Sequence, residues 1–154
     1  MNETHTFAVL VTGSRNWPSP FLVHQRLSEV LLWAHGQGYQ RLAVMHGANP
    51  AGADWFAHTW CEEPETLLPV TELQRPAVWR PGGLYDPAAG YARNDAMVAE
   101  VAEYGGCGCL AFIAPCIKRT CRQPRPHGSH GARHCLDSAR REGIQAGVDY
   151  CSSL

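Results

Sequence analysis

A chain of 154 residues is long enough for one domain with a proper core and too short for two. A hydrophobic share of 45%, a charged share of 18% and a formal net charge of −1 exclude wholesale disorder, and they give no global attraction to nucleic acid or to an anionic membrane. No apolar run approaches the length of a membrane span, and the first residues lack the basic region and apolar core of a signal peptide. We therefore expect a single cytoplasmic domain over residues 1–154 with no membrane partner.

The first half of the chain alternates between apolar runs and helical patterns. A largely β-branched run over Phe7–Thr12 predicts a strand buried on both faces. Apolar side chains at helical spacing predict a helix over Pro20–His35. A second strand follows at Arg41–His46 and a helix at Gly52–Cys61. Thr66–Val70 reads as a short edge strand, because Pro69 argues against a central position.

The second half continues the alternation after a break. Residues Gln74–Pro87 are rich in Pro, Gly and aromatic side chains and predict a long loop, a feature that is often functional in compact domains. A helix is expected over Ala88–Tyr104, a buried strand over Cys109–Ala114 and a helix over Gly131–Glu142. Ile144–Tyr150 predicts a weak last strand.

This alternation is typical of a three-layer α/β/α sandwich with a mostly parallel sheet. In such sheets, the loops at the carboxyl ends of the strands form the ligand crevice. Here those loops are Thr12–Trp17, His46–Asp54 and Pro115–Gly131, and each carries glycine with polar or basic side chains. Their convergence points to a ligand that bears phosphate.

The first of these loops offers the donors that a phosphate needs. Gly13 permits a close backbone approach, Ser14 has a hydroxyl, and Arg15 has a planar charged fork. A strand, a glycine turn and a helix N-terminus recur as an anion site. The alternative is an ordinary turn with a surface arginine. Trp17, Trp79 and Tyr85 also fall in loops, where they either stack on a base or cover the core.

Three stretches together resemble a known family: VTGSRNW at Val11–Trp17, HGANPAGAD at His46–Asp54, and the RN-xx-M pattern of Arg93, Asn94 and Met97. They are similar to the YspA-like branch of the SLOG superfamily, which includes the lonely-guy phosphoribohydrolases and the Rossmann-like domain of DNA-processing protein A. Two further stretches resemble the same branch, Arg75–Trp79 and Ser129–Ile144.

The resemblance implies a Rossmann-like domain that binds a nucleotide or a nucleotide-derived molecule. In the phosphoribohydrolases an arginine and a glutamate flank the glycosidic bond, and Arg93 here matches that arginine. Asn94 replaces the following lysine, Ser129 replaces a loop glycine, and His134 stands at the position of the glutamate. Histidine could act as a base but cannot supply the negative charge that an oxocarbenium-like centre needs. The resemblance therefore supports binding better than catalysis.

The candidate site residues combine both lines of reasoning. His46 either touches the ligand or only ends its strand. Asp54 either caps a helix or holds a ribose hydroxyl, and Arg93 is either a phosphate contact or a solvated surface charge. The expected ligand-binding residues are Gly13, Ser14, Arg15, His46, Gly47, Gly52, Asp54, Arg93, Asn94, Ser129, His130 and Gly131. The candidate catalytic residues are Arg93, Asp54 and His134.

An irregular insert at about 115–130 is rich in Cys, His and Pro and lacks a helical or strand period. The chain has 7 cysteines, an odd number without an export signal, so buried thiols or a metal site are favoured over a disulfide framework. Cys116, Cys121 and His127 are the best ligands for a structural zinc ion. Free thiols and a Cys116–Cys121 disulfide formed on oxidation are the alternatives. Ligand binding itself requires no cofactor.

Three functions follow from these observations. The leading hypothesis is sensing or sequestration of a nucleotide-like small molecule. The second is hydrolysis of an N-glycosidic bond, with Asp54 as the carboxylate and Arg93 beside the phosphoribosyl end. The third is a single-stranded nucleic-acid-binding module, supported by the basic insert and opposed by the net charge of −1. Related domains often form homodimers through their helices, so a homodimer is expected.

Overall fold

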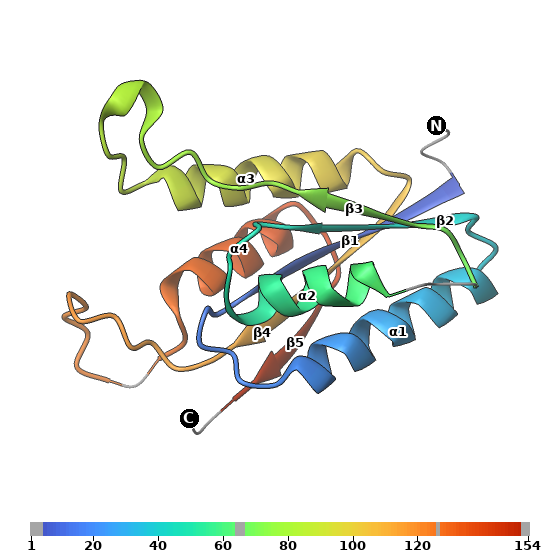
Figure 1. Cartoon of the computed structure of the whole chain (residues 1–154), viewed down its shortest axis with the longest axis horizontal. Coiled ribbons are helices and arrows are strands. Elements are labelled where there is room, and N and C mark those ends of the chain that lie inside the picture. The colour runs from blue at the N-terminus through green and yellow to red at the C-terminus, as the bar shows by residue number, and fades with distance from the viewer. Residues whose placement is uncertain (1–4, 64–66, 126, 152–154) are drawn as a thin grey trace.

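The computed structural model describes residues 5–63, 67–125 and 127–151. A central sheet lies between two layers of helices (Figure 1). The strands are β1 Thr6–Gly13, β2 Arg41–His46, β3 Val70–Gln74, β4 Gly106–Ile113 and β5 Ala146–Tyr150. The helices are α1 Pro20–Gly36, α2 Gly52–Glu62, α3 Ala89–Ala102 and α4 His130–Arg141, with a short 3-10 turn, η2, at Pro81–Gly83.

All five strands are parallel and follow the order β3-β2-β1-β4-β5. The central strand β1 sets the register, because Val9 pairs with Val44 on one side and with Gly108 on the other. Each connection between neighbouring parallel strands contains a helix, as a parallel sheet requires. The predicted fold class, a Rossmann-like α/β sandwich with a parallel sheet, is confirmed.

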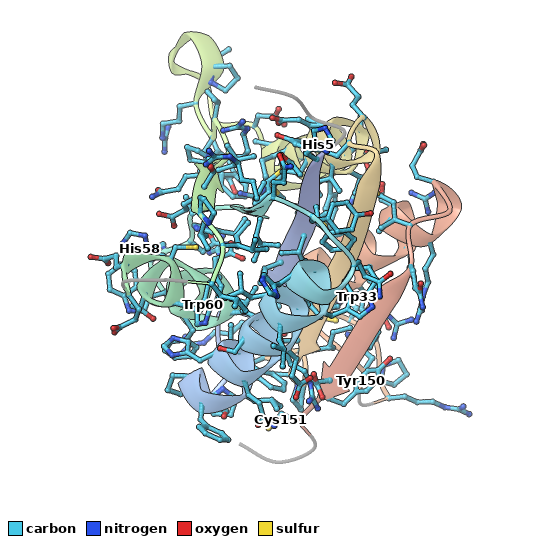
Figure 2. The ribbon with its side chains drawn as sticks, turned by 90° about the vertical axis from the view of Figure 1, so that its right-hand side faces the viewer. His5, Trp33, His58, Trp60, Tyr150 and Cys151 are labelled. Carbon is cyan, nitrogen blue, oxygen red and sulfur yellow. The ribbon has the colours of Figure 1, made fainter. Side chains whose placement is uncertain are left out.

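Alternation along β1 builds two separate cores. Phe7, Val9 and Val11 face α1 and α2, where the helices contribute side chains such as Leu27 and Ala57. Figure 2 looks onto this face, with α1 in front of the sheet and Trp60 of α2 beside it. The indole nitrogen of Trp60 donates to the hydroxyl oxygen of Ser28 on α1, at 3.1 Å.

The intervening residues of β1 pack on the opposite face. Ala8 and Leu10 contact α3 and α4 through side chains such as Met97, Val98 and Cys135. Burial on both faces explains why β1 reads as a continuous apolar run. No helix in the described part of the chain is both long and apolar enough to span a membrane.

Several strand boundaries differ from the sequence prediction by one or two residues, and those of β3 and β4 differ the most. The edge strand β3 lies at Val70–Gln74 and not at Thr66–Val70, whose first residue lies outside the described part. Pairing of Leu42 with Val70 places the strand after Pro69, because proline has no N–H to donate to the ladder. The strand β4 begins at Gly106, three residues before the predicted start at Cys109, because Phe7 of β1 pairs with Gly106.

The insert between β4 and α4 has little regular structure. Residues 115–125 and 127–129 contain one isolated antiparallel bridge, between Pro115 and Gly128. The helix α4 then begins at His130, one residue earlier than predicted. In Figure 1 the insert and the long loop between β3 and α3 both extend from the end of the molecule where the strands finish.

Candidate functional site

A cavity of about 640 Å³ lies at the carboxyl ends of the strands. That volume falls within the usual range for small-molecule sites. Its walls come from the loops after β1, β2, β3 and β4 and from the first turns of α3 and α4. The lining residues are Val11, Thr12, Gly13, Arg15, Asn16, Asn49, Asp54, Trp79, Tyr85, Pro87, Gly90, Tyr91, Arg93, Asn94, Met97, Cys116, Ile117, Lys118, Ser129, His130, Gly131 and Ala132.

The order of the strands explains why the cavity forms at this place. After β1 the chain crosses to β2 on one side, and after β4 it crosses to β5 on the other. The loops that leave β1 and β4 therefore diverge and open a crevice between them, which is the usual ligand position in open parallel sheets.

One wall of the cavity is the N-terminus of α4. In the described part of the chain, the backbone N–H groups of His130, Gly131 and Ala132 have no protein acceptor. Unpaired N–H groups and the helix dipole favour an anion at this end. Arg15 and Lys118 add positive charge to the lining, and neither makes a side-chain ion pair or hydrogen bond with a described residue. This part of the cavity suits phosphate.

Ser14 lies beneath this wall and does not line the cavity. It is buried, and its hydroxyl oxygen accepts a hydrogen bond of 2.8 Å from the backbone N–H of Ala114. The same hydroxyl is 2.6 Å from the hydroxyl of Ser129, the residue that precedes α4. The structure therefore uses Ser14 to hold the ends of β1 and β4 and the start of α4 together.

Asp54 provides a buried carboxylate in the lining. Its Oδ2 atom accepts hydrogen bonds from the side-chain amide and the backbone N–H of Asn49, at 2.9 and 3.4 Å. Burial raises the pKa of Asp54, while His46 and the donors around it act in the opposite direction. Gly52 has a φ of 72° and begins α2 close to the carbonyl oxygen of Ser14, where a side chain would not fit. Asp54 therefore lies in the first turn of a helix that starts directly beside the cavity.

Arg93 lies across the cavity floor between two loops. Its Nη1 atom donates to the carbonyl oxygens of Gly47 and Arg75, at 2.7 and 3.2 Å. Its Nε atom donates to Oδ1 of Asn94 at 3.0 Å. Burial lowers the pKa of Arg93, and the nearby Asp54 carboxylate opposes this shift. No described residue accepts a hydrogen bond from Nη2, so the N–H groups of this nitrogen are available to donate to a ligand.

Asn94 connects the two helices that border the cavity. It is buried, and its side-chain amide donates to the carbonyl oxygen of Gly131 on α4, at 3.2 Å. With Oδ1 bound to Arg93, the side chain fixes the arginine relative to the N-terminus of α4.

Aromatic rings form the outer side of the cavity. Trp79 and Tyr85 stack at 6.2 Å between ring centroids with an interplanar angle of 19°. Arg15 lies 6.0 Å from the Trp79 ring centroid, and Tyr91 adds a third ring from α3. Trp17, in contrast, is buried in the core, and its ring centroid lies 5.4 Å from that of Phe112. The sequence analysis did not name Tyr91 as a candidate, because an aromatic residue within a helical pattern usually indicates a core position.

His46, Gly47 and Gly52 do not line the cavity. The backbone N–H of Ala48 donates to Nδ1 of His46 at 3.0 Å, so Nε2 carries the proton and donates to Glu72 at 2.6 Å. His58 contacts the same carboxylate at 2.8 Å. Burial acts to raise the pKa of Glu72, but hydrogen bonds from His46, His58 and Gln74 together outweigh it, so the pKa is lowered.

His134 also lies outside the lining. Its ring packs on the Tyr91 ring with 4.5 Å between the ring centroids. Its Nε2 atom is 3.7 Å from Oδ1 of Asp95. Its Nδ1 atom is buried and has no partner among the described residues. The carboxylate that lines the cavity therefore belongs to Asp54, and His134 does not take its place.

The insert brings cysteine and histidine side chains together at the edge of the cavity. Donor atoms of Cys116, Cys121, His127 and His130 all lie within 4.8 Å of one another. The structure thus adds His130 to the three residues that the sequence put forward as zinc ligands. Cys116 and His130 line the cavity as well, so the cluster and the cavity share a wall.

The comparisons with known proteins define the class of fold. The chain matches no protein-family model and no curated protein. It is similar to the solved structure of a UGT transferase from Siraitia grosvenorii in complex with UDP, with a TM-score of 0.52 at 16% sequence identity. The match covers 96% of this chain and 28% of the transferase, so this chain spans little more than a quarter of that protein. The likeness shows a Rossmann-like α/β domain.

Proposed function

We propose that this chain binds a nucleotide or a nucleotide-derived small molecule in the cavity at the carboxyl ends of its strands, for sensing or sequestration. One observation carries the proposal. The same cavity combines a helix N-terminus without a side-chain cap, two cations that make no ion pair with a described residue, a buried carboxylate and aromatic rings. These are the four kinds of group that phosphate, ribose and base require.

Each part of such a ligand has a matching part of the wall. The N–H groups at the start of α4, with Arg15 and Lys118, suit the phosphate. The Asp54 carboxylate suits the ribose hydroxyls, and Nη2 of Arg93 is a further donor for phosphate or ribose. The stacked pair of Trp79 and Tyr85 offers a flat surface to a base.

Two further observations support this proposal. The transferase with a similar fold holds UDP. The loops after β1 and β2 and the RN-xx-M helix, which resemble the SLOG superfamily, all contribute residues to one cavity. We propose on this ground that the chain is a SLOG-type domain of the YspA-like branch.

The first experiment is native mass spectrometry of the freshly purified chain, followed by denaturation and identification of any released small molecule. We expect a nucleotide to be released, and the same spectrum reports whether the chain is the homodimer that the resemblance implies. UDP, UMP, AMP and ADP are then titrated by calorimetry and thermal shift. A nucleotide at a hundred times its dissociation constant adds about 2.7 kcal/mol to the free energy of unfolding.

A substitution tests whether binding occurs in this cavity. Arg15→Ala removes a charged donor that makes no hydrogen bond within the described chain, so the fold is preserved and nucleotide affinity falls about tenfold. Arg141→Ala is the matched control, because Arg141 is exposed at the far end of α4. If no nucleotide is released and none of the four raises the melting temperature, the proposal is wrong.

A second candidate function is hydrolysis of the N-glycosidic bond of a nucleoside phosphate. The observation that favours it is the buried Asp54 carboxylate in the cavity, with a raised pKa and with Arg93 nearby. A carboxyl group with a raised pKa can act as a general acid, and its ionised form can stabilise an oxocarbenium-like centre.

For this second candidate we expect free base to accumulate when UMP or AMP is incubated with the chain and products are separated by chromatography. Asp54→Asn keeps the shape and the oxygen that accepts from Asn49, so it should abolish turnover and preserve binding. Turnover that survives this substitution excludes Asp54 as the catalytic group. Tight binding without any free base leaves sensing or sequestration as the function.

A further inference from the structure

Four donor atoms in the insert converge on one point. Nε2 of His130 is 3.6 Å from Sγ of Cys116 and 3.4 Å from Sγ of Cys121. Nε2 of His127 is 3.4 Å from Sγ of Cys121 and 3.0 Å from Nε2 of His130. Each residue therefore turns its best metal-binding atom toward the other three.

These separations match the edges of a zinc tetrahedron. Zn–S bonds of about 2.3 Å and Zn–N bonds of about 2.0–2.1 Å place sulfur and nitrogen about 3.5 Å apart, and two nitrogens about 3.3 Å apart. The three sulfur–nitrogen distances lie within about 0.1 Å of that figure, and the nitrogen–nitrogen distance is slightly shorter.

A contact outside the cluster fixes the tautomer of the His127 imidazole. Nδ1 of His127 lies 2.7 Å from the carbonyl oxygen of Arg125. A carbonyl oxygen only accepts, so Nδ1 carries the proton and Nε2 presents its lone pair to the cluster. Metal-binding histidines are commonly oriented in this way by a carbonyl or carboxylate on the other ring nitrogen.

We propose that Cys116, Cys121, His127 and His130 together bind one zinc ion. The thiolate and imidazole ligands suit zinc among the common divalent ions. Four protein ligands fill the tetrahedron and leave no position for water or substrate, so the ion is structural. The ligands follow the spacing C-x4-C-x5-H-x2-H within 15 residues of chain.

The insert has few other means of holding its conformation. None of its residues in 115–125 and 127–129 is buried, and Ile117, its one aliphatic side chain larger than proline, is 68% exposed. Backbone pairing is limited, although the N–H of Cys116 donates to the carbonyl of His127 at 2.8 Å. Small segments without an apolar core commonly gain their order from a metal.

A second group of possible ligands provides a contrast. His46, His58 and Glu72 also bring donor atoms within 4.8 Å of one another. There, however, the N–H of His46 and a ring nitrogen of His58 point at the Glu72 carboxylate, and hydrogen bonds account for the contacts. Of the two groups found among the described residues, the zinc ion is therefore assigned to the one in the insert.

The test begins with the full chain purified in reducing buffer without chelator and with any purification tag removed. We expect one zinc ion per chain by inductively coupled plasma mass spectrometry. After removal of zinc, Co²⁺ should produce the visible absorption of a tetrahedral site together with thiolate-to-cobalt charge transfer. Cys121→Ser removes one of the two thiolates and should lose roughly half of the charge-transfer absorption, and His127→Ala should reduce zinc content while keeping that band on cobalt addition.

Matched controls come from the same chain. Cys107→Ser changes a partly buried thiol on β4, and His58→Ala changes the other histidine group, so both should retain one zinc ion. Should Cys121→Ser fail to fold, the cobalt spectrum of the unsubstituted chain still reports whether thiolates bind the metal. Three results would overturn the proposal: no uptake of Zn²⁺ or Co²⁺ by the reduced chain, cobalt binding without charge transfer, or a Cys116–Cys121 disulfide by intact mass after reducing purification.

Discussion

At the scale of single residues, the distinction between a binding group and a structural group depends on how many of its donors the protein already uses. Arg93 directs Nη1 at two carbonyl oxygens and Nε at Asn94, yet Nη2 has no acceptor among the described residues. His46 has both ring nitrogens paired within the protein. Because an unused charged donor beside a cavity is available to a ligand, Arg93 is a candidate binding residue and His46 is a structural one.

The Glu72 carboxylate leads to a prediction about stability and pH. Its pKa is lowered in the folded chain, so the ionised form stabilises the fold, and that contribution is present above the unfolded pKa and lost as the pH falls through the folded value. Glu72→Gln should therefore lower the free energy of unfolding by about 1.5–3 kcal/mol at neutral pH. The difference from the unsubstituted chain should narrow below roughly pH 4.

Urea unfolding between neutral and acidic pH measures this effect. Glu142→Gln is the control, because Glu142 is exposed after α4 and makes no side-chain contact with a described residue. The control should stay within about 0.5 kcal/mol of the unsubstituted chain at every pH. A Glu72→Gln deficit that did not change with pH would show that packing, and not the charge, is what the carboxylate contributes.

At the scale of elements, hydrophobic period predicted which segments become strands and helices, but not where they end. The start of β4 illustrates the reason. Glycine has low strand propensity, so the sequence Gly106–Gly108 gives no strand signal. Pairing with Phe7 nevertheless extends β4 through these residues, because a neighbouring strand offers its hydrogen bonds at that register. Boundaries set by a distant partner cannot be read from local sequence.

The candidate site shows the same division between local and distant information. The sequence predicted that the loops after the first, second and fourth strands meet, because parallel strands end at one edge of a sheet. It put Ser14 and Arg15 forward together as ligand-binding residues and could not tell which of the two side chains reaches the cavity. Ser14 and Arg15 are adjacent, yet Ser14 is buried against Ala114 and Arg15 lines the cavity. That choice depends on Ser129 and Ala114, about a hundred residues further along the chain.

Gly13 lies where α2 and β4 approach the end of β1 closely, and no sequence pattern predicts this approach. A Cβ atom at this position would meet the Cβ of Ala53 on α2 and lie 2.8 Å from the carbonyl oxygen of Phe112 on β4. The helix α2 can therefore pack against the end of β1 only because this residue has no side chain. The sequence favoured a ligand-related reason for the glycine, and the structure adds a packing reason.

At the scale of the whole molecule, the insert between β4 and α4 connects the proposed metal site to the proposed ligand site. The chain leaves β4 at Ile113, passes through the insert and returns as α4, whose first turn lines the cavity where phosphate is proposed to bind. Ile117 and Lys118 lie between the ligands Cys116 and Cys121, and His130 is both a ligand and a lining residue. The metal ion would hold one side of the cavity in place, while the sheet and the opposite loops form the other side.

This connection predicts that removing zinc weakens nucleotide binding without unfolding the domain. The core packs around β1 and uses no residue of the insert, so the circular dichroism of the chelated chain should keep its helical content. Ordering each freed residue again on binding costs about 1–2 kcal/mol, so two or three such residues are enough to reduce affinity at least about tenfold. Calorimetric titration of UDP into the zinc-loaded and chelated chains measures the difference in affinity. The control is the His58→Ala chain with zinc bound, which should keep full affinity because His58 lies outside the insert. Equal affinity for UDP in both forms would show that the zinc site does not influence the nucleotide site. The existence of each site would then be decided by its own experiment.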